Sequence, residues 1–517
     1  MAQAHILHPG ELTLPQLRML WAAPELPLAL DPGCRGAIRA SAELVRRATA
    51  GDAPVYGVNT GFGKLATTRI ARDDLALLQL KLLRSHAVGV GEPLSERVVR
   101  LVLLLKAASL ARGFSGVREE VVEALLALYN RGVVPVVPAQ GSVGASGDLA
   151  PLAHLCLPLV GEGEAFFDGE RVPGGQALER AGLQPLQLSA KEGLALINGT
   201  QVSTALALDA LLAADRVFEA AAIAGALTLD AARGSDGPFD PRIHAVRGQP
   251  GQTACAAAYR ALLAGSEIRR SHLQGDDRVQ DPYCLRCQPQ VMGACLDQMR
   301  YAAQVLVREA NAVTDNPLVF ADGEAMISGG NFHAEPVALA ADALAVAIAE
   351  IGAIAERRVA MLVDPVVSRL PPFLTPEPGL NSGFMIVHVT AAALASENKS
   401  LAHPASVDSL PTSANQEDHV SMATFAARRL QPMLRNTAHI VAIELLAAAQ
   451  GIEFLRPLQS APALEGVLRL VRSVSPAMMA DRSLARDIEA LHHLVAAGDI
   501  GRATERQIAE LQALRLA

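Results

Sequence analysis

Apolar residues recur at helical spacing through most of the second half of the chain. Residues 200–233 are expected to form a long amphipathic helix, with a continuous Ala and Leu surface on one side and the charged residues Asp209, Asp215, Arg216, Glu219 and Asp230 against it. Three further segments are similar: residues 334–363, 383–401 and 433–454. A helix of about thirty residues is roughly 45 Å long. The pattern predicts a mainly α protein in which residues 198–517 form a bundle of long helices.

Shorter helical segments alternate with Gly- and Pro-rich breaks before this bundle. The first long break is "GDAPVYGVNTGFGKLATT" and the last is "GEGEAFFDGERVPGG". This change of pattern predicts a smaller N-terminal domain over residues 1–197, followed by the long-helix domain over residues 198–517. Ala-rich helices of such length pack closely, and one chain need not cover all their apolar faces, so we expect the helices to bundle across subunits.

Composition supports helices and excludes several classes of protein. Half of the residues are hydrophobic but only 3% are aromatic, with Trp21 the single tryptophan, so the core is expected to be mostly Ala, Leu and Val. The net charge is −8 and no basic stripe is present, which argues against nucleic acid as a partner. Six cysteines in 517 residues do not indicate a disulfide framework.

Neither a secretory signal nor a membrane span is predicted. The N-terminus lacks a basic segment followed by an apolar one. The longest apolar stretch, within residues 334–363, is interrupted by Asp342 and Glu350, which favours a buried helix over a transmembrane one. We therefore expect a soluble, cytoplasmic protein.

The stretch "AQGSVGASGDLAPLAH" concentrates glycines directly before a helix that is expected to begin near Leu149. Gly147 has no Cβ, so its backbone nitrogen can approach the Ala145 carbonyl. Attack on that carbonyl, with loss of the Ser146 hydroxyl, would give a five-membered ring bearing an exocyclic methylene. The helix N-terminus would stabilise negative charge at this ring. The ordinary alternative is a glycine loop in which Asp148 or Ser146 caps the helix.

The string "GSVGASGDLAPLAH" closely resembles the signature of the aromatic amino acid ammonia-lyases. The resemblance extends over nearly the whole chain, through "YGVNTGFG", "INGTQ", "VQDPYCLRCQPQ", "DNPLVF", "GGNFHAEP" and "SANQEDHVSM". It implies that Ala145, Ser146 and Gly147 cyclise autocatalytically to 4-methylideneimidazol-5-one (MIO), and that no external cofactor or metal is required. It also implies a helical bundle of the fumarase/aspartase-like type and a homotetramer whose active sites are shared between subunits.

Two positions bear on which substrate ring is bound. "LRSHAVGVG" places Ser85 and His86 where phenylalanine-specific members of the family usually carry Phe-Leu and tyrosine-specific members His-Leu. "NQEDHV" places Glu417 where the phenylalanine enzymes carry Gln. A histidine and a carboxylate suit an imidazole ring, whereas a buried charge against a phenyl ring is costly.

Within the family, these residues favour L-histidine as the substrate, with trans-urocanate and ammonia as products in the first step of histidine degradation. The alternatives for the two residues are structural. His86 would be a core or capping histidine, and Glu417 would favour a helix N-terminus.

The remaining site residues follow from the resemblance. Tyr56, in a Gly-rich loop able to close over the site, is expected to remove the β-proton, and its unperturbed pKa of about 10 requires a cationic or hydrogen-bonded setting. Tyr283 is the second catalytic tyrosine, assisting proton transfer or contacting the electrophile. Arg286 is expected to bind the substrate carboxylate, or alternatively to form an exposed salt bridge.

Asn198 and Gln280 are expected to hydrogen-bond the prosthetic ring or the amino and carboxylate groups of the substrate. Phe332 is expected to orient the substrate side chain, with core packing as the equal alternative. The electrophile would make the amino group a better leaving group while the base and the ring-binding residues stabilise charge at the β-carbon.

Two weaker motifs are rejected. "GVNTGFGKLA" is similar to a phosphate-binding loop, but Val58 and Leu65 stand where that motif needs Gly and Ser or Thr. Cys284 and Cys287 form a lone CxxC pair and are expected to be reduced thiols. The scattered histidines His154, His272, His333 and His419 show no HExxH spacing, so no metal site is predicted.

Functions of two other kinds remain open: a protein without activity, and an enzyme of the same family that acts on another substrate or catalyses another reaction. A catalytically silent scaffold would be favoured by loss of Ser146 or Tyr56, but both residues are present. Among enzymes, a phenylalanine or tyrosine lyase or an aminomutase is the alternative.

Overall fold

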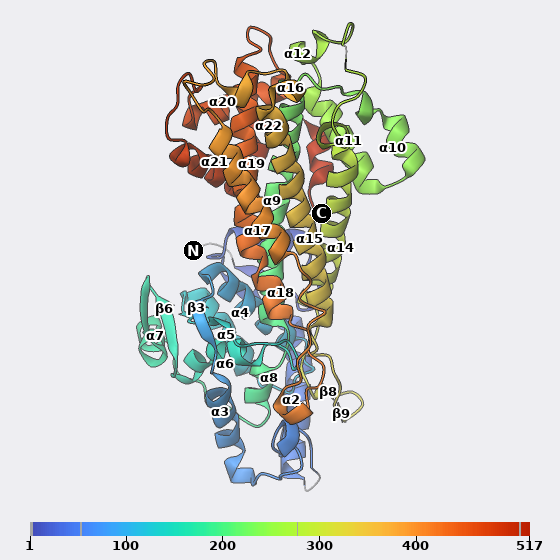
Figure 1. Ribbon diagram of the computed structural model, residues 1–517. Helices are drawn as coiled ribbons and strands as arrows, with labels where there is room; N and C mark the ends of the chain where they lie inside the picture. The colour runs from blue at the N-terminus through green and yellow to red at the C-terminus, as the bar shows by residue number, and fades with distance from the viewer. Residues whose placement is uncertain (1–3, 52–53, 277, 506–507, 517) are drawn as a thin grey trace. The chain divides into compact units, whose positions relative to one another are not determined.

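The computed structural model describes residues 4–51, 54–276, 278–505 and 508–516, and it is mainly helical, with 61% helix and 7% strand (Figure 1). The mainly α fold class is therefore confirmed. The chain divides into two compact units. Unit 1 comprises Met1–Asp209, Ala303–Asp342 and Pro404–Arg428. Unit 2 comprises Ala210–Ala302, Ala343–His403 and Arg429–Ala517.

The domain boundary expected after residue 197 stays a prediction, and the compact units are composed differently. Unit 1 adds residues 303–342 and 404–428 to the N-terminal segment. Phe332 and Glu417, which were assigned to the long-helix domain, therefore fold with the N-terminal segment. The reason is that the loops carrying Phe332 and Glu417 pack against the N-terminal segment. Such tertiary contacts leave no local signal in the sequence.

Unit 1 contains short helices and small sheets. Its helices are α1 (Leu14–Ala22), α2 (Arg35–Ala50), α3 (Leu75–His86), α4 (Glu96–Ala111), α5 (Glu119–Arg131), α6 (Leu149–Cys156), α7 (Gly174–Ala181), α8 (Glu192–Ile197) and α18 (Ala423–Arg428). Its strands are β1 (His5–Leu7), β2 (Leu28–Leu30), β3 (Val90–Pro93), β4 (Val134–Pro135), β5 (Pro138–Gln140), β6 (Glu164–Phe167), β7 (Glu170–Pro173), β8 (Leu318–Phe320) and β9 (Ala325–Ile327). The 3-10 helices are η1 (Pro32–Cys34), η2 (Gly63–Leu65), η3 (Arg72–Asp74), η4 (Leu157–Val160) and η7 (Ser413–Asn415).

The described part of unit 2 consists of helices joined by loops and contains no strand. Its helices are α10 (Pro241–Arg247), α11 (Pro250–Leu263), α12 (Glu267–Arg270), α13 (Tyr283–Arg286), α16 (Pro365–Ser368), α17 (Met385–Leu401), α19 (Leu430–Glu453), α20 (Pro462–Val474), α21 (Ala485–Ala497) and α22 (Asp499–Glu505), with η5 (Gly237–Phe239), η6 (Pro372–Leu374) and η8 (Ala509–Leu514). Three long helices have residues in both units: α9 (Gln201–Ala231), α14 (Gln288–Ala310) and α15 (Glu335–Val363).

The long helices match the apolar periodicity. The segments expected over residues 200–233, 334–363, 383–401 and 433–454 are α9, α15, α17 and α19, respectively. Helix α15 is long and apolar enough to cross a membrane by composition, but 72% of its most apolar window is buried within the protein. Burial of that window matches the expected core helix.

The amphipathic pattern predicted for α9 is wrong, because its acidic residues are buried and hydrogen-bonded. Asp209 accepts a hydrogen bond from Trp21 Nε1 at 2.6 Å within unit 1. Asp230 accepts from the hydroxyls of Ser266 and Ser460 within unit 2, and burial raises its pKa to about 6. These acids satisfy partners from distant segments, so the helix is enclosed on all sides.

A small antiparallel pair positions the glycine-rich stretch of unit 1. Strand β3 pairs with β5 so that Val90 lies opposite Gln140. Helix α3 ends at His86, shortly before β3, and the glycine-rich stretch begins directly after β5. This pairing brings the C-terminus of α3 beside the entrance to residues 141–148. Helix α6 then begins at Leu149, as predicted.

Candidate active site

One cavity of about 1200 Å³ in unit 1 collects most of the residues singled out in the sequence. It is lined by segments far apart in the chain: residues 56–70, the end of α3, residues 145–149, the end of α8, residues 328–333 and residues 413–419. The predicted site residues that line it are Tyr56, His86, Ala145, Ser146, Asn198, Phe332 and Glu417. Gly147 directly follows two of these lining residues.

A carboxylate faces the serine of the Ala-Ser-Gly tripeptide. The Ser146 hydroxyl donates to Glu417 Oε1 at 2.9 Å, and the Thr412 hydroxyl donates to Oε2 at 2.9 Å. Backbone hydrogen bonds also pair Thr412 with Glu417. Glu417 lies between η7 and α18, so the alternative that it favours a helix N-terminus is wrong. Its carboxylate is instead fixed toward the tripeptide.

The backbone of the tripeptide requires glycine at its third position. Gly147 has φ +70°, and a Cβ built on it would lie 2.2 Å from the Gly199 carbonyl oxygen. Gly147 and Gly199 form a β-bridge, and the Asp148 amide donates to the Gly199 carbonyl at 2.7 Å. A side chain at residue 147 is therefore excluded both by conformation and by close approach.

Asp148 anchors the loop rather than capping α6. It is fully buried and makes no side-chain cap to that helix. Its two oxygens accept from the hydroxyls of Ser142 (3.0 Å), Thr424 (2.6 Å) and Ser203 (2.9 Å), and from the Ser203 amide (2.8 Å). Burial raises the pKa of this carboxyl, and these hydrogen bonds oppose the rise. The capping alternative is wrong for Asp148, and it is wrong for Ser146, whose hydroxyl is turned to Glu417.

His86 presents a defined tautomer to the cavity. Its Nδ1 lies 2.9 Å from the Leu82 carbonyl oxygen, which can only accept, and 3.0 Å from the Ser85 hydroxyl oxygen. The Ser85 hydroxyl donates its own proton to the Leu82 carbonyl, so Nδ1 of His86 carries a proton. Burial lowers the pKa of His86, with the Leu82 hydrogen bond and the Glu417 charge opposing the shift. The ring is therefore neutral near pH 7, and Nε2 carries a lone pair.

Tyr56 is held by the Gly-rich segment that follows it. The backbone N–H of Gly63 donates to the Tyr56 hydroxyl oxygen at 3.3 Å. Gly61, Phe62 and Gly63 line the same cavity. The segment thus folds back onto the phenol of Tyr56 and forms one wall of the cavity.

Asn198 and a buried lysine form a second polar group at the cavity. The Asn198 side-chain oxygen is buried and has no hydrogen-bond partner among the described residues. Its backbone carbonyl accepts from Lys106 Nζ at 2.6 Å. Lys106 is 1% exposed, and burial lowers its pKa to about 8. Sequence reasoning missed Lys106, although a lone charge within the apolar run "LVLLLKAASLA" was an available signal.

The segment carrying Phe332 is shaped by a neighbouring asparagine. Phe332 is half-buried and lines the cavity, so its side chain is not part of the closed core. Asn316 Oδ1 accepts from the Gly329 amide at 2.7 Å and from the Ser328 hydroxyl at 3.2 Å. Asn316, also missed in the sequence, therefore holds the turn before Phe332.

Gln280, Tyr283 and Arg286 belong to unit 2 and are not among the described residues that line this cavity. Tyr283 is 70% exposed, and the Arg286 guanidinium lies 4.5 Å from the centre of its ring. Arg286 Nε is buried without a partner in the described part of the chain. Their assignment to the site stays a prediction. Cys284 and Cys287 are free thiols, as expected.

Two histidines that seemed scattered lie together at the edge of the cavity. The rings of His333 and His419 are 5.4 Å apart, and with Glu335 they place three potential ligand atoms within 4.8 Å of one another. These two histidines are therefore not scattered, because folding joins residues that are far apart in the sequence, and the expectation that no metal is bound stays a prediction.

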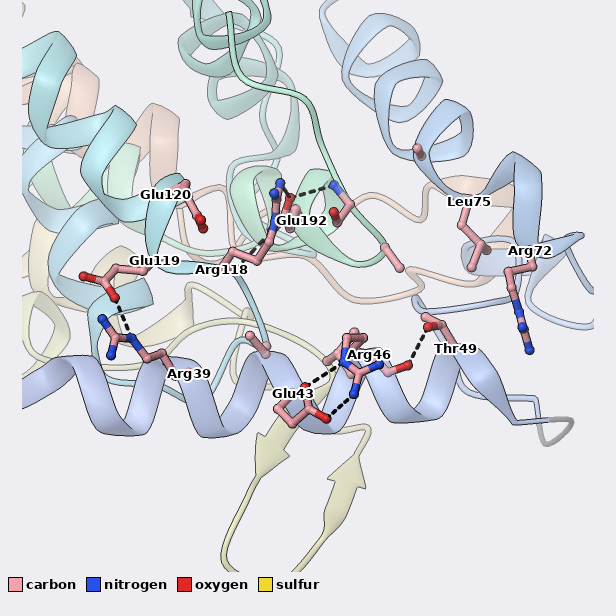
Figure 2. A pocket seen from close by; sticks show the side chains of 16 residues that line it. Arg39, Glu43, Arg46, Thr49, Arg72, Leu75, Arg118, Glu119, Glu120 and Glu192 are labelled. Carbon is pink, nitrogen blue, oxygen red and sulfur yellow. Dashed lines mark hydrogen bonds and ion pairs between the residues drawn. The ribbon is translucent and has the colours of Figure 1, made fainter.

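A second cavity in unit 1, of about 610 Å³, has a different character (Figure 2). Three of the four arginines that line it have carboxylate partners: Arg39 Nε is 2.9 Å from Glu119, Arg46 Nη2 is 2.6 Å from Glu43 and Arg118 Nε is 2.8 Å from Glu192 (Figure 2). None of the predicted site residues lines it. The larger cavity is therefore the candidate active site.

The fold and this constellation define a class of protein. The family model for aromatic amino acid lyases matches residues 12–473, and the chain belongs to this family. It is an ammonia-lyase enzyme.

Particular relatives are similar over nearly their full length. Histidine ammonia-lyase from Aromatoleum aromaticum is 63% identical over 96% of this chain and 94% of its own. The crystal structure of histidine ammonia-lyase from Trypanosoma cruzi is 41% identical, with a TM-score of 0.91 over 99% of this chain and 98% of its own. Tyrosine aminomutase from Streptomyces globisporus is 34% identical, with a TM-score of 0.93 over 98% and 99%.

Proposed function

We propose that this protein is a histidine ammonia-lyase, which eliminates ammonia from L-histidine to give trans-urocanate as the first step of histidine degradation. The observation that carries the proposal is the pair formed by Glu417 and a neutral His86, which line one cavity with the Ala-Ser-Gly tripeptide. The high identity to curated histidine ammonia-lyases supports the same substrate.

The residues present fit an MIO group formed from Ala145, Ser146 and Gly147. Gly147 has the left-handed backbone and close approach that only glycine permits, and Ser146 is held by Glu417. The group, when formed, supplies an electrophile for the substrate amino group. Loss of the Ser146 hydroxyl also removes the donor to Glu417 Oε1, which leaves that oxygen available to an N–H of the substrate ring.

The remaining roles follow from the tautomer and the unpaired groups. His86 Nε2 accepts a hydrogen bond from the substrate imidazole, because its Nδ1 proton is engaged by Leu82. Asn198 Oδ1, which lacks a partner among the described residues, accepts from the substrate amino group. Tyr56 removes the β-proton, and Phe332 orients the ring. Binding the reacting groups at fixed positions lowers the barrier.

Three further residues complete the part of the site that binds the substrate carboxylate. Gln280, Tyr283 and Arg286 act there from another copy of the chain in a homotetramer. Arg286 pairs with the substrate carboxylate. Exposure of the Tyr283 ring supports its availability for such a role. The cytoplasmic location remains a prediction.

The test is incubation of the purified protein with L-histidine, L-phenylalanine and L-tyrosine, one at a time. Histidine alone is expected to give a conjugated product that absorbs in the near ultraviolet, with one ammonia per product. The structural likeness to tyrosine aminomutase makes β-amino acid formation the second candidate. A β-amino acid without ammonia release, or faster turnover of phenylalanine or tyrosine, would contradict the proposal.

A further inference from the structure

Three histidines surround one carboxylate on unit 2, and none of these four residues was assigned to the candidate active site. His439 lies on α19, and Glu489, His492 and His493 lie on α21. Helices α19 and α21 pack side by side within the unit (Figure 1). Because positions i, i+3 and i+4 share one face of a helix, Glu489, His492 and His493 project from one side of α21 toward His439.

The distances suit a small cation. His439 Nε2 lies 3.1 Å from Glu489 Oε2, and His492 Nδ1 lies 3.6 Å from Glu489 Oε1. One ligand atom from each of these three residues lies within 4.8 Å of the others. In a tetrahedral zinc site with bonds of about 2.0–2.2 Å, ligand atoms are about 3.3–3.6 Å apart.

The tautomer of His439 favours a ligand role. Its Nδ1 lies 2.8 Å from the Arg435 carbonyl oxygen, so Nδ1 carries the proton. Nε2 then points a lone pair at the Glu489 carboxylate unless a proton or a metal ion lies between them. A backbone carbonyl that accepts from the other ring nitrogen is the usual support of a metal-bound histidine.

His492 contributes an unpaired nitrogen. Its Nδ1 is buried and has no hydrogen-bond partner among the described residues. The rings of His439 and His492 stack at 3.8 Å, and the soft χ2 torsion of histidine lets them turn toward a shared ion.

We propose that His439, Glu489 and His492 bind a divalent transition-metal ion of the zinc type, which joins α19 to α21. Two imidazoles and one carboxylate are a donor set that zinc accepts. His493 Nε2, 3.2 Å from Glu489 Oε1 and largely exposed, stands where a further ligand or a bound water completes the coordination. The ion has a structural role, in which it stabilises the contact between α19 and α21, and it takes no part in the lyase reaction.

The test measures zinc retained by the full-length protein after incubation with zinc chloride and dialysis. The wild-type protein is expected to retain one more zinc ion per chain than either His439→Ala or Glu489→Gln. His388→Ala is the matched control, because His388 and Glu356 form a 2.9 Å pair in the same unit, and among the described residues no second histidine completes a metal-binding group there. This control is expected to retain as much zinc as the wild type.

A second readout is thermal unfolding with and without zinc. Zinc is expected to raise the melting temperature of the wild type and of His388→Ala, and not that of His439→Ala, since a ligand stabilises only the state that binds it. Because His333, Glu335 and His419 also bring three potential ligand atoms together, the difference between variants is decisive. Equal zinc retention by the wild type, His439→Ala and Glu489→Gln would overturn the proposal, as would an equal loss in the control. Glu489→Gln settles the question if His439→Ala does not fold.

Discussion

At the scale of single residues, the account depends on how Glu417 is held. Two hydroxyls, from Ser146 and Thr412, donate to its two oxygens. A carboxylate held in this way is ready to exchange one donor for the N–H of a substrate ring. Hydrogen bonds to charged groups contribute about 1.5–3 kcal/mol, more than those between neutral groups.

Glu417→Gln is expected to lower kcat/KM for histidine by about tenfold to a hundredfold, which corresponds to that loss of 1.5–3 kcal/mol. Steady-state kinetics measure the effect. Thr412→Val is the control, because it removes one donor and keeps the charge, so it should cost less. Activity of the Glu417→Gln protein close to that of the wild type would show that the carboxylate does not bind the substrate.

A second residue-scale prediction concerns pH and Lys106. Burial lowers the pKa of Lys106 from 10.5 to about 8, so as the pH rises the folded protein loses this proton at a lower pH than the unfolded chain does. Below pH 8, burying the charged ammonium lowers the free energy of unfolding. This destabilisation disappears as the pH rises from about 8 to about 10.5. Relative to Lys106→Met, the wild-type free energy of unfolding should rise over this window by about 3 kcal/mol.

Denaturant titrations of both proteins at several pH values provide the measurement. The comparison with Lys106→Met removes the contribution of buried thiols, whose raised pKa values act in the opposite direction. A constant difference between pH 8 and 10.5 would show that Lys106 titrates as it does in the unfolded chain.

At the scale of elements, the glycine-rich loop between β5 and α6 is the most constrained part of the site. Gly147 combines a left-handed backbone with contact to Gly199, and Asp148 anchors the loop to residues of α9 and α18. A left-handed conformation costs a residue with a side chain roughly 1–2 kcal/mol, and overlap with the Gly199 carbonyl adds to it.

Gly147→Ala is therefore expected to abolish ring formation, with the intact mass of the plain chain and no turnover of histidine. Gly182→Ala is the matched control, since Gly182 has nearly the same φ (+69°) but nothing within 4 Å of a Cβ. That variant should lose only about 1–2 kcal/mol of stability and keep its activity. Normal turnover by Gly147→Ala would contradict the requirement for glycine at this position.

The bounds of the long helices were predicted from the sequence far better than the side chains that contact them. The bounds of α15, α17 and α19 follow the apolar period, because a strong period over many residues specifies a helix on its own. The buried acids of α9 were misread, since hydroxyl and indole partners from distant segments satisfy them. Periodicity does not distinguish an exposed charge from a buried one with a partner.

The residues of the candidate site divide in the same way, into those that sequence motifs identified and those that only folding brings together. Motifs identified Tyr56, His86, Asn198 and Glu417, which line one cavity. Lys106 and Asn316, and the meeting of His333 with His419, depend on contacts made only after folding. The sequence contains no short-range signal for such pairs.

At the scale of the whole molecule, the central proposal is that sites are shared between copies of the chain. Tyr56 belongs to unit 1 and Tyr283 to unit 2, and Tyr283 does not line the described cavity. If Tyr283 serves a site built on another copy, then two inactive variants can complement each other.

Co-expression of Tyr56→Phe with Tyr283→Phe is expected to restore histidine turnover, because mixed tetramers contain some sites with both tyrosines intact. Each variant alone should be nearly inactive, and recovery should not exceed about a quarter of the wild-type rate for sites built from two chains. The control pairs Tyr56→Phe with Ser146→Ala, both on unit 1, and should recover nothing if these residues serve the same site from one chain. No recovery in the first pair would contradict sharing of the two tyrosines.

The account as a whole rests on the claim that Ala145, Ser146 and Gly147 close into the MIO ring that the lyase reaction requires. The most direct test of this claim measures the intact mass and the activity of one preparation. Closure of Ala145, Ser146 and Gly147 removes two waters, so the wild-type mass should be about 36 Da below that of the plain chain and histidine should be converted to urocanate. Ser146→Ala should lack the dehydration and be inactive. A wild-type protein with the full plain-chain mass that still released ammonia from histidine at its normal rate would contradict the account.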